Sequence, residues 1–244
     1  MERIDVLLCN LNFFESRAKA KQAIADGCIE VNGELVTKSS LKVDESADIK
    51  IVKEPLKYVS RGALKLLKAI DEFDLSFTDK VVCDIGASTG GFTEVSLEYG
   101  AKKVFSIDVG QDQLHQRLVN DDRVINMEQT NFRYVIDEDF DTPIDICVTD
   151  VSFISLKLIL VPIFNVLKEG GEAIVLVKPQ FEAGKKHLNK HGVVRDKKIH
   201  KKVIDDIINY SKDVGFKIIN IIDSPILGGD GNKEFLLYMK KMSR

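Results

Sequence analysis

Apolar and polar residues follow two different layouts along the chain, and the change falls near residue 53. The first part has helical spacing over residues 4–8, and a second helical segment runs from Ser16 to Gly27, residue types typical of an N-cap and a C-cap. The segment CIEVNGELV then alternates around Asn32-Gly33, the strongest short hairpin signal, and DIKIV predicts a closing strand. We therefore expect a small α+β unit, over residues 1–53, with two helices followed by a short sheet.

From residue 61 to residue 244, short apolar runs alternate with longer helix-like runs. The strand-like runs are KVVCDI, KVFSID, RVINM, DICVTD and EAIVLVK, and helix-like runs such as FTEVSLEYG and SLKLILVPIFNVLKEG (155–170) lie between them. This alternation predicts a mostly parallel, doubly wound α/β sheet. The late runs FKIINIIDS and KEFLLYMKK are expected to pair antiparallel at one edge. Residues 54–60, which include Pro55, are predicted to be a linker.

Composition excludes several classes of protein. Hydrophobic residues make up 44% and charged residues 30% of the 244 residues, which is ordinary for a soluble globular protein. The N-terminal residues are too charged for a signal peptide, and no apolar run reaches the roughly 18 residues of a membrane helix. None of the four cysteines forms a C-x-x-C pair. We therefore expect reduced, packed thiols in a cytoplasmic protein with no metal and no membrane insertion.

Charge is unevenly distributed although the net charge is only −3. Between Lys178 and Lys202 there are nine Lys or Arg residues against two acidic ones, Glu182 and Asp196. Such a run is either a solvated helix face or a phosphate-binding surface. The first half of the run lacks helical periodicity, and Gly184 and Gly192 are candidate hinges of a flap. Its candidate phosphate contacts are Lys185, Lys186 and Lys190.

The segment VVCDIGASTGGFTEVSLEYGAKKVFSIDVG, residues 81–110, places a glycine-rich turn between a strand and a helix. An acidic residue, Asp108, ends the next strand, at the distance that suits a ribose hydroxyl pair. Ser88 stands where a dinucleotide-binding turn has its second glycine, so close contact with a pyrophosphate is not required. S-adenosyl-L-methionine, which has a ribose but no phosphate, fits this pattern, and a dinucleotide site or a plain tight turn are the alternatives. The candidate cofactor-binding residues are Asp84, Gly86, Ala87, Ser88, Gly91, Phe92, Asp108, Val109, Asn131 and Asp150.

Four further charged residues fall in short motifs of the second unit: Lys65 in SRGALKL, Asp150 in VTDVSF, Lys178 in LVKPQFE and Glu234 in NKEFLL. Each one alone is explained as a strand or helix end that meets water. The carboxyl ends of parallel strands, however, line the binding crevice of such sheets. As a set beside the glycine turn, the four resemble the Lys-Asp-Lys-Glu tetrad of FtsJ-like RNA ribose 2′-O-methyltransferases.

The first unit resembles the S4 RNA-binding domain. The matching features are R-I-D at 3–5, S-R at 16–17, the segment G-C-I-E-V-N-G and the late D-I-K-I strand. The resemblance implies RNA binding through clustered basic residues that hold a nucleic-acid backbone without reading bases; a surface helix with scattered charges is the alternative. The candidate RNA-binding residues outside the basic run are Arg3, Arg17, Lys19, Lys21, Arg61 and Phe181, the last as an aromatic surface for a displaced base or simply a core aromatic.

An S4 domain joined to an FtsJ-like, Rossmann-like methyltransferase domain is the arrangement of the TlyA family, also named hemolysin A. The resemblance covers essentially the whole chain, including D-I-G-A-S-T-G-G-F-T, D-V-S-F-I-S and a late G-N-K-E-F. It implies ribosomal RNA 2′-O-methylation, with cytidine the usual nucleotide and ribosomal RNA or ribosomal subunits as partners. Asn131 departs from the family, in which an Asp often bonds the adenine at this point, so that contact is expected through an amide.

The chemistry explains the residue types that the resemblance implies. A ribose hydroxyl is a poor nucleophile that must lose its proton as the methyl group transfers. A neutral Lys178 could accept that proton, since burial and the nearby charge of Lys65 favour a neutral amine. Asp150 would orient Lys178 and attract the sulfonium of the donor, and Glu234 would hold a lysine or the ribose.

Other activities fit the sequence less well. Amine methyltransferases usually carry [DN]-P-P-[FYW] where this chain has Asp150-Val151-Ser152-Phe153, and carbon methylation usually needs a reactive cysteine, whereas Cys147 lies within a strand run. Two alternatives stay open: an S4-type RNA-binding module without catalysis, and a hemolysin that acts on membranes. No strongly amphipathic surface segment favours the second.

Overall fold

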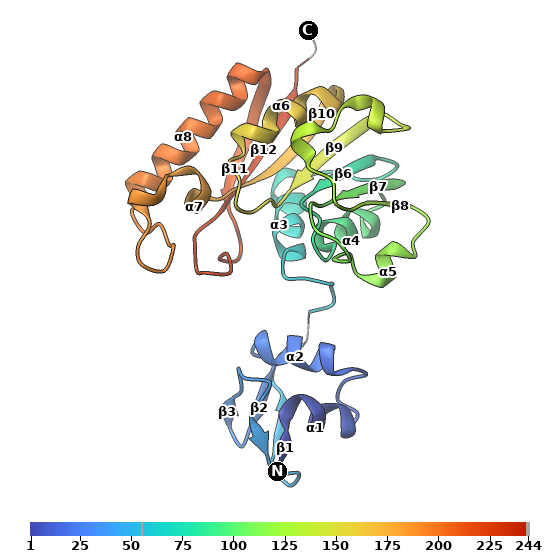
Figure 1. Ribbon diagram of the computed structural model, residues 1–244, viewed down its shortest axis with the longest axis vertical. Coiled ribbons are helices and arrows are strands. Elements are labelled where there is room, and N and C mark those ends of the chain that lie inside the picture. The colour runs from blue at the N-terminus through green and yellow to red at the C-terminus, as the bar shows by residue number, and fades with distance from the viewer. Residues whose placement is uncertain (55, 243–244) are drawn as a thin grey trace. The chain divides into compact units, whose positions relative to one another are not determined.

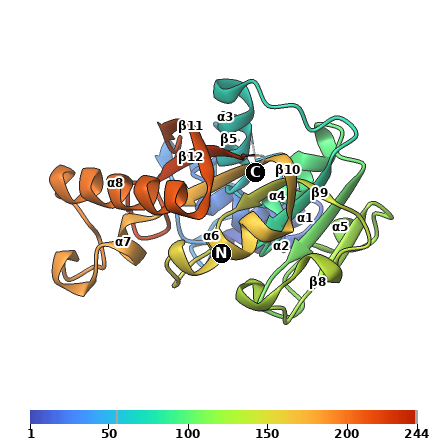
Figure 2. The same cartoon turned by 90° about the horizontal axis from the view of Figure 1, so that it is seen from above.

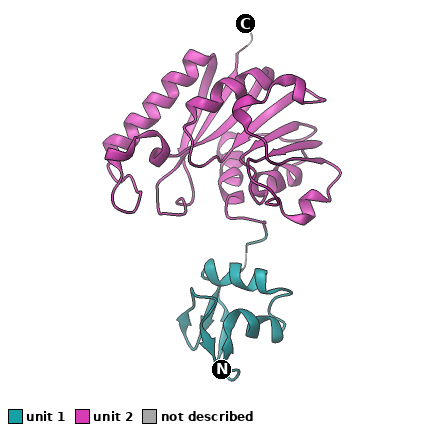
Figure 3. Cartoon of the chain, viewed as in Figure 1, with its two compact units in different colours: residues 1–57 teal, residues 58–244 magenta. Residues whose placement is uncertain are grey.

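The computed structural model describes residues 1–54 and 56–242, so Pro55, on which the predicted linker rests, lies outside the described residues. The chain forms two compact units, residues 1–57 and residues 58–244 (Figure 3). Each unit has its own apolar core.

The first unit has the predicted order of two helices followed by short strands: β1 (Glu2–Arg3), α1 (Ile4–Asn10), α2 (Arg17–Ala25), β2 (Ile29–Val31), β3 (Glu34–Leu35), β4 (Lys42–Val43) and β5 (Ile49–Ile51). β2 lies between β3 and β5 in an antiparallel sheet, and β1 pairs with β4. The two-residue strands β1 and β4 are too short to leave a period in the sequence. Apolar residues of both helices and of β2 form the core.

Local turn chemistry explains the boundaries in this unit. The Ser16 hydroxyl accepts a hydrogen bond from the backbone N–H of Lys19 at 3.3 Å, so Ser16 is the predicted N-cap of α2. The helix ends at Ala25, and its C-cap is Asp26, one residue before the predicted C-cap Gly27, which has φ of +67°. Asn32 and Gly33 have φ values of +51° and +85°, as the two central residues of a type I′ hairpin turn require.

The second unit is a seven-stranded sheet in the order β11-β12-β10-β9-β6-β7-β8 (Figures 1 and 2). Strands β10, β9, β6, β7 and β8 are parallel, whereas β12 is antiparallel to both of its neighbours, which confirms the predicted antiparallel pairing of the two late strands. The bounds of the strands are β6 (Val81–Ile85), β7 (Lys103–Ile107), β8 (Val124–Met127), β9 (Ile144–Thr149), β10 (Leu167–Val177), β11 (Phe216–Asp223) and β12 (Phe235–Lys241).

Helices cover both faces of this sheet and bury two apolar cores. One core lies between the sheet and α6 and α8, and the other lies between the sheet and α3 and α4. The central strands are apolar on both faces for this reason. The bounds of the helices are α3 (Ala63–Phe73), α4 (Gly91–Glu98), α5 (Gln116–Val119), α6 (Lys157–Val166), α7 (Pro179–Glu182), α8 (Lys197–Val214) and the 3-10 turns η1 (Phe132–Tyr134), η2 (Asp137–Asp139) and η3 (Lys185–His187).

The predicted helix over residues 155–170 is wrong in its last turn. α6 ends at Val166, and Leu167 already pairs with Ile144 as the first residue of β10. Gly170, with φ of +70°, lies where the register of this pairing shifts. Leu167 is buried, and pairing with β9 outweighs the helical spacing of the local sequence.

Candidate active site

The glycine-rich turn joins β6 to α4 at the centre of the sheet. Gly86 has φ of +79°, and a Cβ there would lie 3.0 Å from the side chain of Val151. Gly90 has φ of +97°, and a Cβ there would lie 2.2 Å from Leu118. Both positions therefore require glycine. Ser88, in contrast, carries its side chain at φ of +49° at the place of the missing second glycine.

Two adjoining hollows open at the carboxyl ends of these strands, with volumes of about 450 Å³ and about 370 Å³. They share five lining residues, Gly86, Ser88, Asp150, Ser152 and Phe153. All ten residues predicted to bind the cofactor line one or both of them: Asp84, Gly86, Ala87, Ser88, Gly91, Phe92 and Asp150 the larger, and Gly86, Ser88, Asp108, Val109, Asn131 and Asp150 the smaller. The structure thus brings together residues that are up to 66 positions apart, from Asp84 to Asp150.

Asp108 braces the glycine turn from the end of β7. Its carboxylate accepts hydrogen bonds from the backbone N–H groups of Ser88 and Gly110, each at 2.8 Å. Asn131 is exposed and caps η1, since its side-chain oxygen accepts the N–H of Arg133 at 3.2 Å. Because that oxygen is engaged locally, the amide N–H₂ is the group of Asn131 that suits the expected contact with an adenine in the smaller hollow.

Asp84 is almost completely buried beneath the turn. Its carboxylate accepts a hydrogen bond from the Thr93 hydroxyl at 2.7 Å. Burial raises the pKa of Asp84 to about 7, and the carboxylates of Asp150 and Asp108 add to this shift, while the Thr93 hydrogen bonds oppose it. A cation placed beside Asp84 would favour its ionised form.

The donor set of the hollows fits S-adenosyl-L-methionine. Three carboxylates, those of Asp84, Asp108 and Asp150, line the hollows and suit a ligand with an ammonium, a sulfonium and a ribose. The smaller hollow is also lined by apolar side chains, including Ile107, Phe132 and Ile154, which suit a purine ring. The same carboxylates would repel a pyrophosphate, which disfavours the dinucleotide alternative.

The pH dependence of donor binding is expected to follow the ionisation of Asp84. Below about pH 7 its carboxyl is neutral in the free protein and attracts an ammonium weakly, so donor affinity should rise with pH, by up to tenfold per unit, and level off near pH 7. Calorimetry between about pH 5 and about pH 7.5 measures this profile. Thr93→Val removes a hydrogen bond to Asp84 and should move the profile to higher pH, while Asp84→Asn should flatten it. A wild-type profile that is flat over this range would contradict the assignment.

The four predicted catalytic residues meet in the larger hollow. Asp150 lies at the centre: its Oδ2 is 2.9 Å from the Nζ of Lys65, and its Oδ1 is 2.6 Å from the Nζ of Lys178. Glu234 completes the set, with its Oε2 2.9 Å from the Nζ of Lys65. Two lysine side chains thus face two carboxylates, and all four residues are largely buried.

Burial and pairing act in opposite directions on these groups. Burial lowers the pKa of Lys65, but the carboxylates of Asp150 and Glu234 outweigh it and hold this pKa above its usual value. Burial raises the pKa of Asp150, but Lys178 and Lys65 outweigh it and hold this pKa below its usual value. Lys65 is therefore a fixed positive charge and Asp150 a fixed negative charge beside Lys178.

Two residues of the hollow were missed by the sequence reasoning. The hydroxyl of Ser152 accepts a hydrogen bond from the Nζ of Lys178 at 2.8 Å. The side-chain amide of Gln180 donates to Glu234 at 3.3 Å, and its Oε1 has no hydrogen-bond partner among the described residues. The sequence offered one indication of these two residues: each lies two positions after a predicted catalytic residue.

The predicted RNA-binding residues of the second unit lie in the larger hollow or on the loop between α7 and α8. Arg61 and Phe181 line it, and Phe181 contacts Phe153 with ring centroids 5.2 Å apart. Phe153 is 91% exposed with φ of +64°. Lys185, Lys186 and Lys190 lie on the exposed loop between α7 and α8. The second half of the basic run forms α8, capped by Asp196, so the run is partly a helix face and partly a loop.

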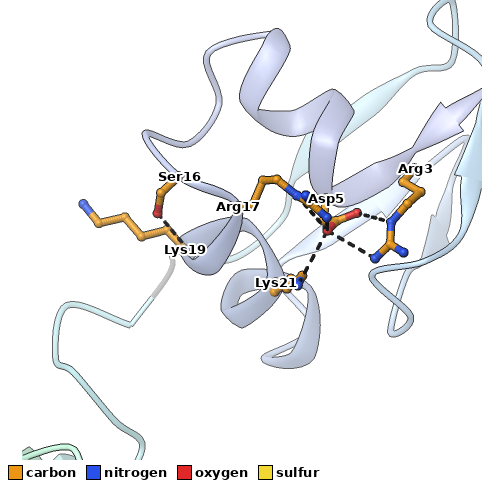
Figure 4. A network of polar contacts seen from close by, with 6 residues as sticks. All are labelled: Arg3, Asp5, Ser16, Arg17, Lys19 and Lys21. Atoms are coloured by element: carbon orange, nitrogen blue, oxygen red, sulfur yellow. Dashed lines mark hydrogen bonds and ion pairs between the residues drawn. The ribbon is translucent and has the colours of Figure 1, made fainter. Parts of the chain in front are cut away.

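In the first unit, Asp5 organises three of the four predicted RNA-binding cations (Figure 4). Its buried carboxylate lies 2.9 Å from Arg3, 2.9 Å from Arg17 and 4.0 Å from Lys21. The hydrogen bond from Arg3 is the main reason that the pKa of Asp5 falls to about 2, and Arg17 adds to it against the effect of burial. Lys19 lies on the same helix, α2, but outside this cluster, and it pairs with Glu15. Residues two apart on a helix do not share a face.

Two family models match this chain, one in each unit. The family model described as FtsJ-like methyltransferase matches residues 58–241, and the S4 domain model matches residues 2–49. The chain belongs to the FtsJ-like methyltransferase family. It carries an S4 domain at its N-terminus, as the sequence resemblance predicted.

Relatives of this FtsJ-like methyltransferase match over nearly their whole length. YqxC of Bacillus subtilis, provisionally named an rRNA methyltransferase, is 46% identical over 98% of this chain and 85% of its own. Hemolysin A of Brachyspira hyodysenteriae is 42% identical over 97% of this chain and 98% of its own. The 16S/23S rRNA (cytidine-2′-O)-methyltransferase TlyA of Mycobacterium tuberculosis is 34% identical over 98% of this chain and 89% of its own. The predicted membership of the TlyA family is confirmed.

Solved structures agree with the assignment of the chain to this family. A protein of Streptococcus thermophilus, provisionally named a hemolysin, superposes with a TM-score of 0.80 at 46% identity, covering 99% of this chain and 89% of its own. The N-methyltransferase NodS of Bradyrhizobium japonicum shares the fold alone, at 13% identity and a TM-score of 0.52. In the part of the chain that the structure describes, none of the helices is both long and apolar enough to span a bilayer.

Proposed function

We propose that this protein transfers a methyl group from S-adenosyl-L-methionine to a ribose 2′-hydroxyl of ribosomal RNA, with cytidine as the target nucleotide. The tetrad carries this proposal: two buried lysines meet on the two oxygens of Asp150, beside hollows that suit the donor. The S4 domain and the named activity of the M. tuberculosis relative support RNA, and cytidine within it, as the substrate.

The residues that would hold the donor are those that line the two hollows. Asp108 would accept hydrogen bonds from the ribose hydroxyls, and Asp84 would pair with the ammonium. Asp150 supplies a fixed negative charge for the sulfonium. When bound, S-adenosyl-L-methionine supplies an electrophilic methyl group, which leaves with its bonding pair remaining on sulfur.

Lys178 is the proposed general base. Its neutral amine accepts the proton of the 2′-hydroxyl while the oxygen forms its new bond to the methyl carbon. Asp150 and Ser152 fix the Nζ of Lys178 from two sides, at 2.6 Å and 2.8 Å. Lys65, held by Asp150 and Glu234, adds a second positive charge to the same site. Most of the rate enhancement then comes from positioning, because the donor's charge disperses during transfer.

RNA binding is assigned to two basic surfaces, one on each unit. In the first unit, the side chains of Arg3, Arg17 and Lys21 converge on Asp5. The single negative charge of Asp5 offsets only one of these three positive charges, so the cluster is net positive. In the second unit, the exposed lysines of the loop between α7 and α8 are phosphate contacts, and Phe181, which lines the larger hollow, is a stacking surface for the base.

Substitution of Lys185, Lys186 and Lys190 together by alanine should weaken RNA binding and flatten its salt dependence. Each lost phosphate contact should reduce the log–log salt slope by about 1. The slope is measured by titrating labelled RNA at several salt concentrations. Lys197, Lys198 and Lys201, which are exposed on α8, provide a triple variant of equal charge change as the control. An unchanged slope in the loop variant would show that these lysines are solvated surface charges that do not contact phosphates.

The activity itself is tested with purified protein, labelled donor and ribosomal subunits. Incorporation of label into ribose 2′-oxygens, mapped at cytidines, is the expected result. RNA binding without incorporation would support a binding module instead, and lysis of red cells by the purified protein would support a hemolysin. Label found on a base would overturn the assignment of the acceptor.

A further inference from the structure

The loop between α7 and α8 is held in a defined conformation by its own hydrogen bonds. The side chain of Asn189 accepts the backbone N–H groups of His191 and Val193, at 2.8 Å and 3.0 Å. Gly192 donates its N–H to the carbonyl of Asn189 at 3.0 Å and has φ of +74°. Gly192 is therefore a turn residue of a small closed loop rather than the free hinge that the sequence suggested.

One buried side chain ties this basic loop to the segment that carries Glu234. Asn232 is 1% exposed, and both ends of its amide are used. Its Oδ1 accepts the N–H of Val194 at 3.0 Å, and its Nδ2 donates to the carbonyl of Gly192 at 3.1 Å. The amide carries its donor and its acceptor on separate atoms of one short side chain, so one residue can serve both backbone groups.

Asn232 is connected to the basic loop through its hydrogen bonds and to the tetrad through the chain segment that carries Glu234. Val194 is buried, and its carbonyl accepts a hydrogen bond from the ring Nε2 of His200 at 2.8 Å, which holds Val194 at a second point. Two residues after Asn232, Glu234 pairs with Lys65, which in turn pairs with Asp150. A displacement of the loop relative to Asn232 would therefore move the lysines of the loop relative to the tetrad.

We propose that Asn232 is a positioning residue that fixes the basic loop against Glu234, so that the RNA backbone held by the loop lies in register with the tetrad. The proposal rests on the RNA methyltransferase function proposed above. It assigns to the asparagine of the G-N-K-E-F motif a role that the catalytic chemistry itself does not require. Asn232 acts through the loop and touches neither the donor nor the reacting hydroxyl.

A double-mutant cycle in the full-length protein tests this role. The variants are Asn232→Ala, the triple alanine variant of Lys185, Lys186 and Lys190, and the two combined. Asn232→Ala should weaken RNA binding about tenfold and reduce the salt slope, with donor affinity unchanged. If Asn232 works by holding the loop, the combined variant should bind RNA no more weakly than the triple variant. Additive losses, or an unchanged salt slope in Asn232→Ala, would overturn the proposal.

Two further variants separate positioning from general stability. Ser211→Ala removes another buried hydrogen bond, from Ser211 to the carbonyl of Ile207 in α8, and should leave the salt slope unchanged. Asn232→Asp keeps an acceptor for Val194 but sets a second acceptor against the carbonyl of Gly192, so it should also weaken RNA binding and reduce the salt slope. Asn232→Asp also serves if the alanine variant does not fold, and an Asp variant whose RNA affinity matches wild type would then sink the proposal.

The two proposals fail in different ways. If wild-type protein binds RNA through the loop but transfers no methyl group to ribose, the function fails and the role of Asn232 in loop position stands. If methyl transfer is intact and the cycle is additive, only the role of Asn232 fails.

Discussion

Replacing Lys178 by arginine should reduce the rate of methyl transfer by more than about 100-fold. Arginine keeps the positive charge beside Asp150 but cannot give up its proton at workable pH, so it cannot accept the proton of the 2′-hydroxyl. Lys178→Ala should be equally inactive. Donor affinity should change little in either variant, because the proposed donor contacts come from other residues of the hollows. Single-turnover rates at saturating RNA and donor measure the chemical step separately from binding.

Lys65→Arg is the matched comparison for this prediction. Lys65 is also buried and paired with Asp150, but its proposed role requires only a positive charge. It should therefore tolerate arginine better than Lys178 does. A Lys178→Arg enzyme within about tenfold of wild type, roughly 1.4 kcal/mol of barrier, would end the general-base assignment.

Replacing Asp108 by alanine should weaken donor binding by about 100-fold or more, which corresponds to about 2.7 kcal/mol. The change removes the acceptor proposed for both ribose hydroxyls, and hydrogen bonds to a charged group contribute about 1.5–3 kcal/mol each. It also removes the carboxylate that accepts the N–H groups of Ser88 and Gly110, so the glycine turn loses its brace. Calorimetry with the donor measures the loss, and RNA affinity should stay near the wild-type value.

Glu128→Ala controls for the loss of a loop brace. The Glu128 carboxylate accepts the N–H groups of Asp112 and Gln113, at 2.9 Å and 3.2 Å, but it does not line either hollow. It should therefore leave donor affinity within about twofold of wild type, which is less than about 0.5 kcal/mol. If Asp108→Ala binds the donor as wild type does, Asp108 is not at the ribose.

Local chemistry made much of this protein predictable from its sequence. The Asn32-Gly33 hairpin needs two positive φ angles, and few residue pairs accept them, so these two residue types are enough to place the turn. The parallel strands could be placed because strands buried on both faces leave short apolar runs. The glycine turn and Asp108 could be linked because a parallel sheet brings the ends of neighbouring strands together.

The resemblance to FtsJ-like RNA ribose 2′-O-methyltransferases selected the four proposed catalytic residues, but their pairing needed the tertiary structure. Lys65 and Asp150 are 85 positions apart, and nothing near either residue indicates that Asp150 serves both lysines. Glu234 was expected to hold a lysine or the ribose, and the structure places it on Lys65. Ser152 and Gln180 were missed because their roles arise from contacts across the hollow.

The sequence by itself determined which segments form strands, turns and helices, since these depend on neighbours within a few residues. Only the tertiary structure decided where α6 gives way to β10, which cations gather on Asp5, and that Asn232 joins the basic loop to the segment of Glu234. The physical reason is the same in each case. A buried polar or charged group is stable only when its partners are supplied, and those partners come from segments that are distant in the chain and adjacent in the fold.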